Sequence, residues 1–576
     1  MKYYKIIVIV MVVFFCSGNS WAQSGVGRFH SEPLAKNIGP FNGNDHARAY
    51  NILADEGYRT PVSNYQQITE QVSSTSPASW IRLKFNTVNL GDHSYITIVS
   101  DADGGTQKLN SSTINVWNNG TAMFNGNSVT LTLHIASTDV NIGFSIAEMV
   151  VGEADPNAPI PETQCGATDN RVASSTDAIG RLSPVGCTGW LIANGSFLTA
   201  GHCTGASMDI IEFNVPSSTS NGFTVASDPD DQYPVGTVVF QNGAAGNGND
   251  WAVFSVGVNS NTGLNPNEAQ GFFDSFDQTF FRVTKDNSAV TNRITGYGTD
   301  DIPVGTGGGR NSDSQTQQTS NGGVYSEIGT GSAVGINYQI DTEGGNSGSP
   351  VIINGTINTV GIHTNGGCNT TTTPGTNAGT GFEEDDLEVA IEAFNPSGDV
   401  YVDEGHPSAT ASGTVLRPFK TVNSAITAAA SGNTIYIAEG GYAETVVTSK
   451  TLTIKAPVGL VVIGPNAPAA IAANTPVEAR SETKLEQTSA TSVWNTYPNP
   501  FLSRIHIKNE TFESGDVEIS MYNLLNQKVA VLANYQNIEG VMYYENFDLS
   551  YLPKGVYTMV VNHNGKQSIS KITKAE

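Results

Sequence analysis

The sequence predicts an all-β chain of several domains, and three observations support this. The chain has 576 residues, which at about 100–200 residues per domain indicates three to five domains. Charged residues make up 14% and glycine numbers 61, a composition typical of β-rich exported proteins. Apolar runs are short, alternate with polar residues and are separated by Gly, Asn and Asp turns. The 38% hydrophobic content can build cores, which argues against a disordered chain.

The charge balance excludes one class of partner. The chain has 28 Lys and Arg against 53 Asp and Glu, a net charge of −25. A nucleic-acid-binding surface must be basic to displace the counterions of the phosphates. We therefore expect no nucleic-acid partner.

The N-terminus has the pattern of a signal peptide, which we place at residues 1–22. Lys2 and Lys5 are followed by an apolar run from Ile6 to Phe15, which is too short to span a bilayer. Small residues in Ser20-Trp21-Ala22 predict cleavage after Ala22, the alternative being a true membrane anchor. No later stretch reaches 18 apolar residues, so no transmembrane anchor is expected.

Four cysteines remain after the predicted signal peptide, namely Cys165, Cys187, Cys203 and Cys368. An even number in an exported chain favours two disulfides, and four cysteines allow three pairings. No CxxC spacing is present, which argues against a zinc site. We predict no metal or cofactor and interpret the acidic run Glu383-Glu384-Asp385-Asp386 as a solvated face, the alternative being a calcium site.

Five segments follow the signal peptide. Residues 23–162 contain an alternating β-sandwich pattern at residues 75–152 and end in a proline-rich linker. Residues 163–397 form the largest block, and residues 398–464 have short strands spaced like the rungs of a parallel β-helix, too few to stand alone. Residues 465–495 indicate a flexible linker, and residues 496–576 a last β module.

The largest block carries a set of residues suited to nucleophilic catalysis. His202, Asp250 and Ser347 occur in that order, each beside a strand-like run. A serine hydroxyl needs an adjacent base, which His202 can supply, and Asp250 can hold that base in the right tautomer. Gly345 and Gly348 allow a tight turn in which the amides of Gly345 and Ser347 converge on an oxyanion.

The motifs TAGHC around His202, DWAVF from Asp250 and GNSGSPV around Ser347 resemble those of chymotrypsin-like (trypsin-like) serine endopeptidases. The resemblance implies two six-stranded β-barrels with the site in the crevice between them. It implies a Ser347 nucleophile, a His202 general base and acid, an orienting Asp250 and an oxyanion hole from the Gly345 and Ser347 amides. Asn346 stands where trypsin-type enzymes carry an Asp that pairs with a new N-terminal ammonium, so we do not expect that activation switch.

The same resemblance bears on the cysteines. The family often has a disulfide that clamps the histidine loop, which implies a Cys187–Cys203 bond. Cys165 and Cys368 would then form the second, similar to a long-range bridge of bacterial lysyl endopeptidases.

Two features of the expected specificity pocket predict opposite charges for the preferred substrate residue. Thr342 and His363 resemble the pair that holds a substrate carboxylate in bacterial glutamyl endopeptidases, and an imidazole can donate to a carboxylate. Asp341 instead lies at the offset that selects Lys or Arg in trypsin. We favour cleavage after Glu or Asp, with a Lys or Arg preference, or neither, as alternatives.

The flanking regions suggest processing and export. The N-terminal sandwich loosely resembles pro-regions of lysyl-endopeptidase relatives, and we interpret it as a pro-region that folds the enzyme as a zymogen or covers its cleft. The alternative is a permanent accessory domain. Residues 398–464 resemble pectate-lyase-like β-helices, and we assign them no activity.

Motifs such as Tyr497-Pro498-Asn499-Pro500 and Gly555-Val556-Tyr557 resemble the C-terminal sorting domain of the type IX secretion system of Bacteroidetes. That resemblance implies the export machinery as a partner and a secreted or cell-surface location. The expected function is a secreted serine endopeptidase acting on polypeptides. Its rivals are an inactive protease-like adhesion protein and a β-helix carbohydrate-active enzyme.

Overall fold

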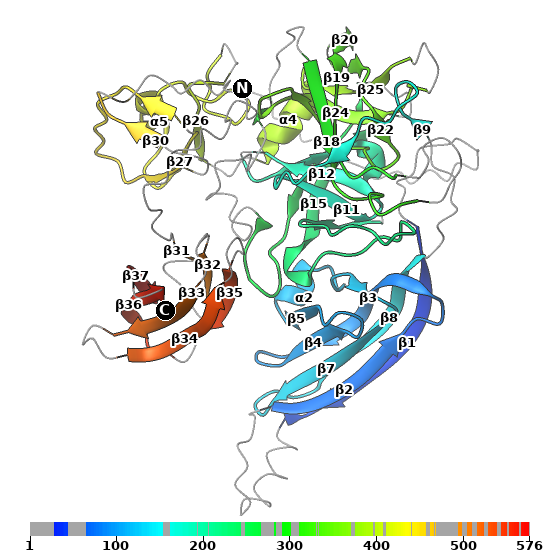
Figure 1. Ribbon diagram of the computed structural model, residues 1–576, viewed down its shortest axis with the longest axis vertical. Coiled ribbons are helices and arrows are strands. Elements are labelled where there is room, and N and C mark those ends of the chain that lie inside the picture. The colour runs from blue at the N-terminus through cyan, green and yellow to red at the C-terminus, as the bar shows by residue number, and fades with distance from the viewer. Residues whose placement is uncertain are drawn as a thin grey trace, which may run out of the picture. The chain divides into compact units, whose positions relative to one another are not determined.

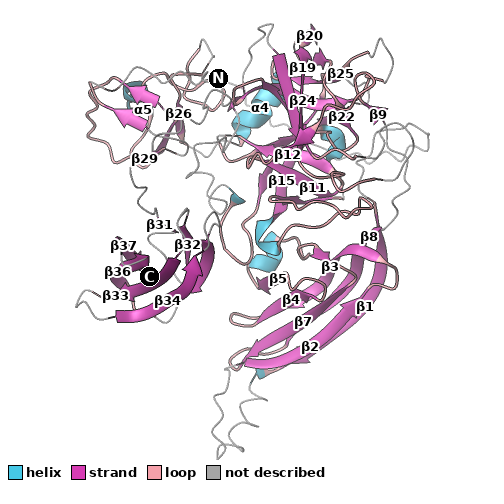
Figure 2. Ribbon diagram, viewed as in Figure 1, coloured by secondary structure: helices cyan, strands magenta, loops and turns pink. Residues whose placement is uncertain are grey.

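The structure is a computed structural model of the full chain. The residues it describes are 28–43, 65–153, 162–192, 194–205, 207–243, 248–266, 282–283, 291–300, 310–329, 331, 333–369, 375–394, 398–406, 410–438, 440–456, 461–465, 467, 494–497, 504–509, 515–523, 528–537, 543–549, 552–563 and 566–574. The predicted signal peptide lies outside the described residues, as does nearly all of the predicted linker at 465–495. The chain divides into two compact units, Met1–Ala479 and Arg480–Glu576, and strands dominate both (Figure 2).

The first unit begins with a β-sandwich (Figure 1). Its strands are β1 (Phe29–Phe41), β2 (Tyr65–Ser73), β3 (Ala78–Asn89), β4 (Tyr95–Ser100), β5 (Thr106–Asn110), β6 (Phe124–Asn125), β7 (Ser128–Ala136) and β8 (Ile142–Glu153), with a short helix α2 (Thr113–Val116). One sheet has the order β1-β8-β3-β6 and the other β2-β7-β4-β5. Strands β4 and β7 bury alternate side chains, which is the sequence pattern that predicts a sheet with one covered face.

The sandwich begins earlier than its alternating pattern at residues 75–152 suggests. Strand β1 pairs with β8, and β2 pairs with β7. The β1–β8 register shifts between Pro33 and Lys36 and again between Ile38 and Phe41. Such irregularities interrupt the two-residue period, so alternation could not reveal β1 in the sequence.

A closed six-stranded barrel follows, with the order β11-β12-β13-β16-β15-β14. Its elements are β11 (Ile179–Pro184), β12 (Cys187–Leu191), β13 (Phe197–Thr199), β14 (Met208–Glu212), β15 (Gln232–Asn242) and β16 (Asp250–Val256), with 3-10 turns η1 (Gly201–Cys203) and η2 (Pro229–Asp231). Every residue of β11, β12 and β13 is buried. Trp190, Phe197 and Phe254 are among the largest buried side chains of its core.

The second half of this region is a nine-stranded sheet. Its main order is β10-β19-β18-β23-β24-β25-β21-β20, and β17 pairs with β24. The bounds are β10 (Val172–Ala173), β17 (Arg282–Val283), β18 (Thr291–Gly296), β19 (Gln318–Val324), β20 (Ser326–Gly329), β21 (Val334–Tyr338), β23 (Pro350–Ile353), β24 (Asn358–Asn365) and β25 (Asn377–Gly381). Two short strands, β9 (Glu162–Thr163) and β22 (Thr342–Glu343), form a separate pair. Among the described strands, the first half closes by pairing and the second half does not.

Helix α4 (Asp385–Ala393) ends this region. The Glu384 side chain caps it by accepting a hydrogen bond from the Leu387 amide. Acidic residues in the first turn suit the positive end of the helix dipole. The helix buries Leu387 and Ile391 against the barrel core.

The β-helix-like segment packs on α4, as we expect for a fragment with few rungs. It consists of β26 (Val400–Val402), α5 (Val422–Ala428), β27 (Thr434–Ile437), β28 (Gly440–Tyr442), β29 (Thr453–Lys455) and β30 (Val461–Ile463). All its strand pairs are parallel: β26-β27-β29 form one sheet and β28-β30 the other. Arg417 pairs with Glu388 of α4, and Tyr401 and Leu416 belong to the same apolar cluster as the barrel core.

The second unit is a sandwich of a three-stranded sheet, β31-β32-β35, and a four-stranded sheet, β34-β33-β36-β37. Ile505, Ile519 and Met559 lie in its core. The strands are β31 (Trp494–Tyr497), β32 (Arg504–Asn509), β33 (Gly515–Tyr522), β34 (Lys528–Asn537), β35 (Tyr543–Asp548), β36 (Gly555–His563) and β37 (Lys566–Lys574).

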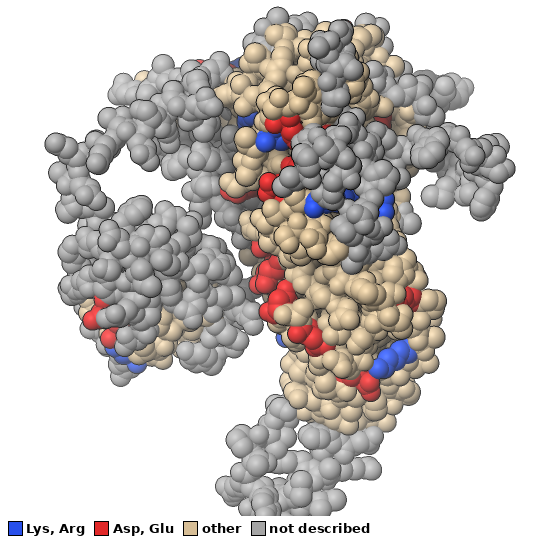
Figure 3. Space-filling view, turned by 45° about the vertical axis from the view of Figure 1, so that its right-hand side comes forward, with Lys and Arg blue, Asp and Glu red and all other residues tan. Residues whose placement is uncertain are grey.

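The excess of acidic residues is visible at the surface, where Figure 3 shows several red patches of Asp and Glu and few blue ones. Within the described part of the chain, none of the helices has the length and apolarity needed to cross a membrane.

Candidate active site

The histidine and the carboxylate that the sequence pairs are in direct contact. His202 lies in η1, just after β13, and Asp250 is the first residue of β16. His202 Nδ1 is 2.6 Å from Asp250 Oδ2, and the His202 backbone N–H donates to Oδ1 at 2.8 Å. Because a carboxylate only accepts, Nδ1 carries the proton and Nε2 keeps its lone pair. The two side chains are 9% and 5% exposed, so water competes little for this bond.

Asp250 is also tied to the second half of the domain. Its N–H donates to Thr380 Oγ1 at 3.1 Å, and the same hydroxyl lies 2.9 Å from the Asp250 carbonyl oxygen. Thr380 belongs to β25, so the carboxylate that orients His202 is positioned by both halves.

Ser347 lies in a tight turn between β22 and β23 that is held from two sides. The Thr188 N–H of β12 donates to Ser347 O at 2.9 Å, and Trp190 Nε1 donates to Gly348 O at 3.0 Å. From the other half, His363 O of β24 accepts from the Gly348 N–H at 2.8 Å. The turn therefore bridges the two halves of the domain.

Glycine is required at two positions of this turn. Gly345 has φ +102° and Gly348 has φ +91°, values that side chains disfavour. A Cβ on Gly348 would lie 2.2 Å from both Thr188 O and Thr199 Oγ1. A larger residue would thus push the turn away from the barrel that carries His202.

Two amides of the turn have no acceptor within the described part of the chain. Among the described residues, neither the Gly345 N–H nor the Ser347 N–H donates a hydrogen bond, whereas the Asn346 N–H between them donates to Glu343 O at 3.0 Å. Both free amides flank the Asn346 position, so an oxygen placed against the turn has two donors within the same few residues.

The turn lies beside the histidine loop without bonding to the imidazole. The sulfur of Cys203, the residue after His202, is 3.8 Å from Ser347 O. His202 Nε2 is buried and has no hydrogen-bond partner among the described residues, so Ser347 Oγ does not donate to it. Catalytic hydrogen bonds are often long in unliganded enzymes and tighten around substrate.

Both cysteine pairs lie at disulfide distance. Cys187 and Cys203 have an S–S distance of 2.06 Å, and Cys165 and Cys368 one of 1.91 Å. The first joins β12 to the histidine loop. The sulfurs of Cys187 and Cys203 and a His202 nitrogen lie within 4.8 Å of one another, but these sulfurs are bonded to each other and cannot serve as thiolate ligands.

Thr342 is fully buried beside the side-chain amide of Asn377, which belongs to no sequence motif. Asn377 Nδ2 donates to Thr342 Oγ1 at 2.9 Å. Asn377 Oδ1 accepts from the amides of Gly367 and Cys368 at 2.8 and 3.0 Å. Asn377 thus connects Thr342 to the chain around the second disulfide.

His363 is also buried, at 3% exposure, and its Nδ1 is 2.7 Å from the Tyr338 hydroxyl. Burial, with a smaller contribution from His202, lowers the pKa of His363 to about 3, so the imidazole is neutral at neutral pH. Tyr338 was not predicted either, because a single tyrosine in a strand pattern gives no sign that its hydroxyl faces a histidine.

The contacts of Asp341 differ from those expected of a residue that binds a substrate Lys or Arg. Its Oδ1 accepts from the Cys165 N–H and its Oδ2 from the Asn170 N–H, both at 2.8 Å. The residue is 4% exposed. Both oxygens therefore hold the segment from Cys165 to Asn170 in place.

Comparisons with known proteins agree with this architecture. The family model described as "Trypsin" matches residues 168–380, and the one described as "Secretion system C-terminal sorting domain" matches residues 495–575. A search of curated proteins finds no match. A solved structure of HL collagenase aligns with 38% of this chain and 94% of its own, at 12% identity and a TM-score of 0.24, too weak a likeness to support any inference. This all-β chain thus carries a trypsin-like domain and a type IX secretion sorting domain.

Proposed function

We propose that the protein is a secreted serine endopeptidase in which Ser347, His202 and Asp250 form the catalytic triad. The observation that carries this proposal is the buried His202–Asp250 pair, whose 2.6 Å bond leaves Nε2 as a base with no partner among the described residues. Few structural roles would leave a buried imidazole nitrogen unpaired next to a serine turn.

The proposed reaction uses the chain's own groups at each step. Ser347 Oγ attacks the scissile carbonyl as His202 Nε2 takes its proton, and Asp250 stabilises the imidazolium. The carbonyl oxygen becomes an oxyanion that the Gly345 and Ser347 amides receive. The imidazolium then protonates the leaving amine, and a water, activated by the same nitrogen, hydrolyses the acyl-enzyme.

For substrate preference we propose cleavage after Glu or Asp. Trypsin-like selection of Lys or Arg needs a carboxylate in the pocket, and the bonds from the Cys165 and Asn170 amides engage both oxygens of Asp341. This weakens the Lys or Arg alternative. His363 and Thr342 remain as polar side chains for a substrate carboxylate.

A neutral His363 can serve this role only as one tautomer. If the Tyr338 hydroxyl donates to Nδ1, the proton of His363 sits on Nε2 and can be donated to a carboxylate. The Tyr338 hydroxyl also donates to Ala378 O at 3.1 Å, so the proposed tautomer requires the hydroxyl proton to point to Nδ1, at the shorter distance of 2.7 Å, and not to Ala378 O.

The C-terminal unit supports an export route. The sorting-domain match at residues 495–575 implies recognition by the type IX secretion machinery. We propose that a signal peptide at residues 1–22 directs the first membrane crossing. The sorting domain then directs the second, with release or surface attachment after its removal.

The test is covalent labelling of the purified chain by a fluorophosphonate probe. We expect labelling of the parent protein and none of Ser347→Ala. A parent protein that folds but does not label would favour the inactive adhesion protein, and polysaccharide cleavage that survives Ser347→Ala would favour the β-helix enzyme.

A panel of fluorogenic peptides that differ only in the residue before the scissile bond tests specificity. We expect the highest kcat/KM for Glu. Preference for Lys or Arg would remove the proposed roles of His363 and Thr342.

A further inference from the structure

We infer that the N-terminal sandwich, residues 29–153, is a retained and non-inhibitory partner of the protease domain and does not block its cleft. Among the described residues, every hydrogen bond and ion pair between the two regions falls on residues 209–261 of the protease domain. None involves His202, Asp250 or Ser347. A pro-region that inhibits by covering the cleft would have to contact these groups.

Charged groups anchor one part of the interface. Arg82 of β3 is 1% exposed, donates to Thr121 O at 2.6 Å and pairs with Asp209 of β14. Lys84 reaches the same Asp209 oxygen at 2.6 Å. Burial lowers the pKa of Arg82, and attraction to Asp209 opposes that shift. Removing Asp209 would leave a buried guanidinium without its carboxylate, which is strongly unfavourable.

A buried amide continues the interface. Gln232, at the start of β15, is fully buried. Its Oε1 accepts from the Met123 N–H at 2.7 Å, and its Nε2 donates to Met123 O at 2.9 Å. This reciprocal pair imitates the hydrogen bonding between two strands, and both partners would lose it on separation.

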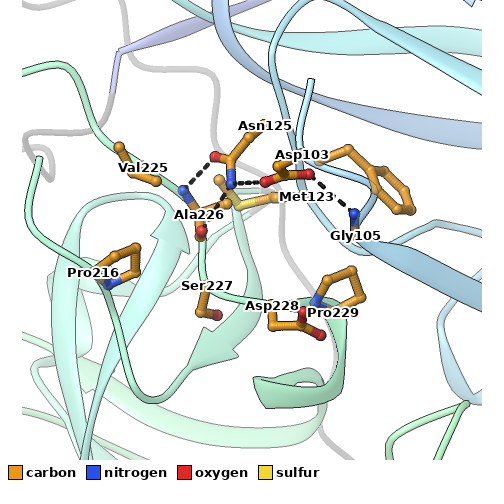
Figure 4. Close-up of a pocket in the computed structure, with 11 residues that line it drawn as sticks. Asp103, Gly105, Met123, Asn125, Pro216, Val225, Ala226, Ser227, Asp228 and Pro229 are labelled. Atoms are coloured by element: carbon orange, nitrogen blue, oxygen red, sulfur yellow. Dashed lines mark hydrogen bonds between the residues drawn. The ribbon is translucent and has the colours of Figure 1, made fainter. Parts of the chain in front are cut away.

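A second reciprocal pair lies beside it, as Figure 4 shows. The Ala226 N–H donates to Asn125 Oδ1 at 2.8 Å, and Asn125 Nδ2 donates to Ala226 O at 3.1 Å. Asn125 Nδ2 also donates to Asp103 at 2.8 Å, which fixes its orientation. A cavity of about 310 Å³ opens here between the two regions, with Met123 on one side and Pro216 on the other.

The interface also contains apolar core. Ile210 and Ala226 of the protease domain belong to the same apolar cluster as Trp80 and Phe124 of the sandwich, and they are 0% and 2% exposed. Separation would expose this shared core to water, and apolar surface of that kind opposes separation. The sandwich thus completes the wall of the first barrel formed by β14 and β15.

The linker between the two regions is described here by its sequence, because residues 154–161 lie outside the described residues. Residues 153–162 read EADPNAPIPE, and their three prolines suit an exposed connection. A cut in this linker breaks one covalent connection and leaves the interface described above unchanged. The sandwich should therefore stay bound when the chain is processed there.

The test uses the full chain with residues 156–160 replaced by the recognition sequence of a sequence-specific protease. After complete cutting, size-exclusion chromatography at about 0.15 M salt should show the two fragments eluting together. Ser347→Ala prevents self-digestion in this arm. In the active chain, the rate of fluorophosphonate labelling should agree within about twofold before and after the cut, since a tenfold difference would mark a real change in access.

A pair of carboxylate-to-amide variants identifies the interface. Asp209→Asn should raise the dissociation constant of the two cut fragments by about tenfold or more, so that they separate at protein concentrations where the parent fragments stay together. Glu70→Gln, which removes an ion pair with Lys36 inside the sandwich, should behave as the parent does.

Three outcomes would overturn the inference: fragments that separate at once on cutting, labelling that rises tenfold when the linker is cut, or equal behaviour of Asp209→Asn and Glu70→Gln. The non-inhibitory part of the inference rests on the proposed function. If neither cut nor uncut protein labels, the non-inhibitory part of the inference fails, and labelling of the larger fragment after its separation from the sandwich decides whether the proposed function fails as well. Co-elution decides independently whether the sandwich is retained.

Discussion

Exchanging Asp250 for asparagine tests the proposed role of the buried ion pair with the smallest change in shape. Asp250 Oδ1 accepts from the His202 backbone N–H at 2.8 Å. An asparagine must keep its oxygen at that position, because its NH₂ group cannot accept. The NH₂ group then replaces Oδ2 and donates to His202 Nδ1. The histidine proton is thereby forced onto Nε2, which can no longer accept the proton of Ser347.

The expected effect is large on rate and small on folding. The same exchange in the serine-protease triad lowers kcat by about 10⁴, which corresponds to about 5 kcal/mol of transition-state stabilisation. The backbone contact to Oδ1 survives, and so do the two contacts between Asp250 and Thr380, which involve only the backbone of Asp250. The variant should therefore unfold at a denaturant concentration close to that of the parent.

The assay is kcat on the best fluorogenic peptide, with labelling by fluorophosphonate as a second reading. Asp92→Asn is the matched control, because Asp92 is an exposed carboxylate of the sandwich, and it should retain parental activity. A kcat of Asp250→Asn within about tenfold of the parental kcat would show that the tautomer of His202 does not control the reaction. The proposed triad would then lose its support.

Three further predictions follow from the same region. Replacing Cys187 and Cys203 together by alanine opens a bridge with a sequence separation of 16, and chain entropy predicts a loss of about 3 kcal/mol in unfolding free energy by denaturant titration; an unchanged midpoint would contradict this. Tyr338→Phe removes the hydroxyl that lies 2.7 Å from His363 Nδ1. The ratio of kcat/KM for Glu over Gln peptides should fall by about tenfold, the value of one hydrogen bond to a charged group, while cleavage of apolar peptides stays unchanged. An unchanged ratio would show that Tyr338 has no part in substrate selection. Because the pKa of His363 falls from 6.5 to about 3 on folding, its contribution to stability is complete above pH 6.5 and is lost as the pH falls toward 3. Both proteins compared carry Ser347→Ala. Between pH 7 and about 4.5, the one with His363 should lose about 2 kcal/mol more free energy of unfolding than the one with His363→Gln, measured by urea unfolding at each pH. Equal losses in the two proteins would refute the lowered pKa of His363.

Sequence patterns predicted the parts of the fold whose side chains alternate or are uniformly apolar. Strands β4 and β7 have the expected period of two. Strand β1 was missed because two register shifts disturb its pattern. The docking of the sandwich on β14 and β15 could not be predicted, since it depends on single side chains such as Gln232 and Asp209 that bond to a distant part of the chain.

The candidate site divides in the same way. His202, Asp250 and Ser347 could be proposed because each lies in a motif of several residues that resembles a known pattern. Tyr338 and Asn377 belong to no such motif, and only folding brings their polar atoms to His363 and Thr342. Supporting residues of this kind act through one bond each, and a single side chain leaves no local signature in the sequence.

Asp341 shows that the offset of a residue from Ser347 along the chain does not determine what its side chain contacts. Its backbone leads directly into β22, which pairs with β9 at Glu162 and Thr163. Because that pairing brings the start of the protease domain alongside, the amides of Cys165 and Asn170 reach both oxygens of Asp341. The bond between Cys165 and Cys368 then fastens the same segment from the other side. Two amide donors hold this carboxylate where it stands, so turning it toward a substrate cation would break both hydrogen bonds and release the first residues of the domain. Under the proposed function, the segment from Cys165 to Asn170 therefore keeps the Asp341 carboxylate away from the substrate, and a variant such as Asp341→Asn should loosen that segment before it alters substrate choice.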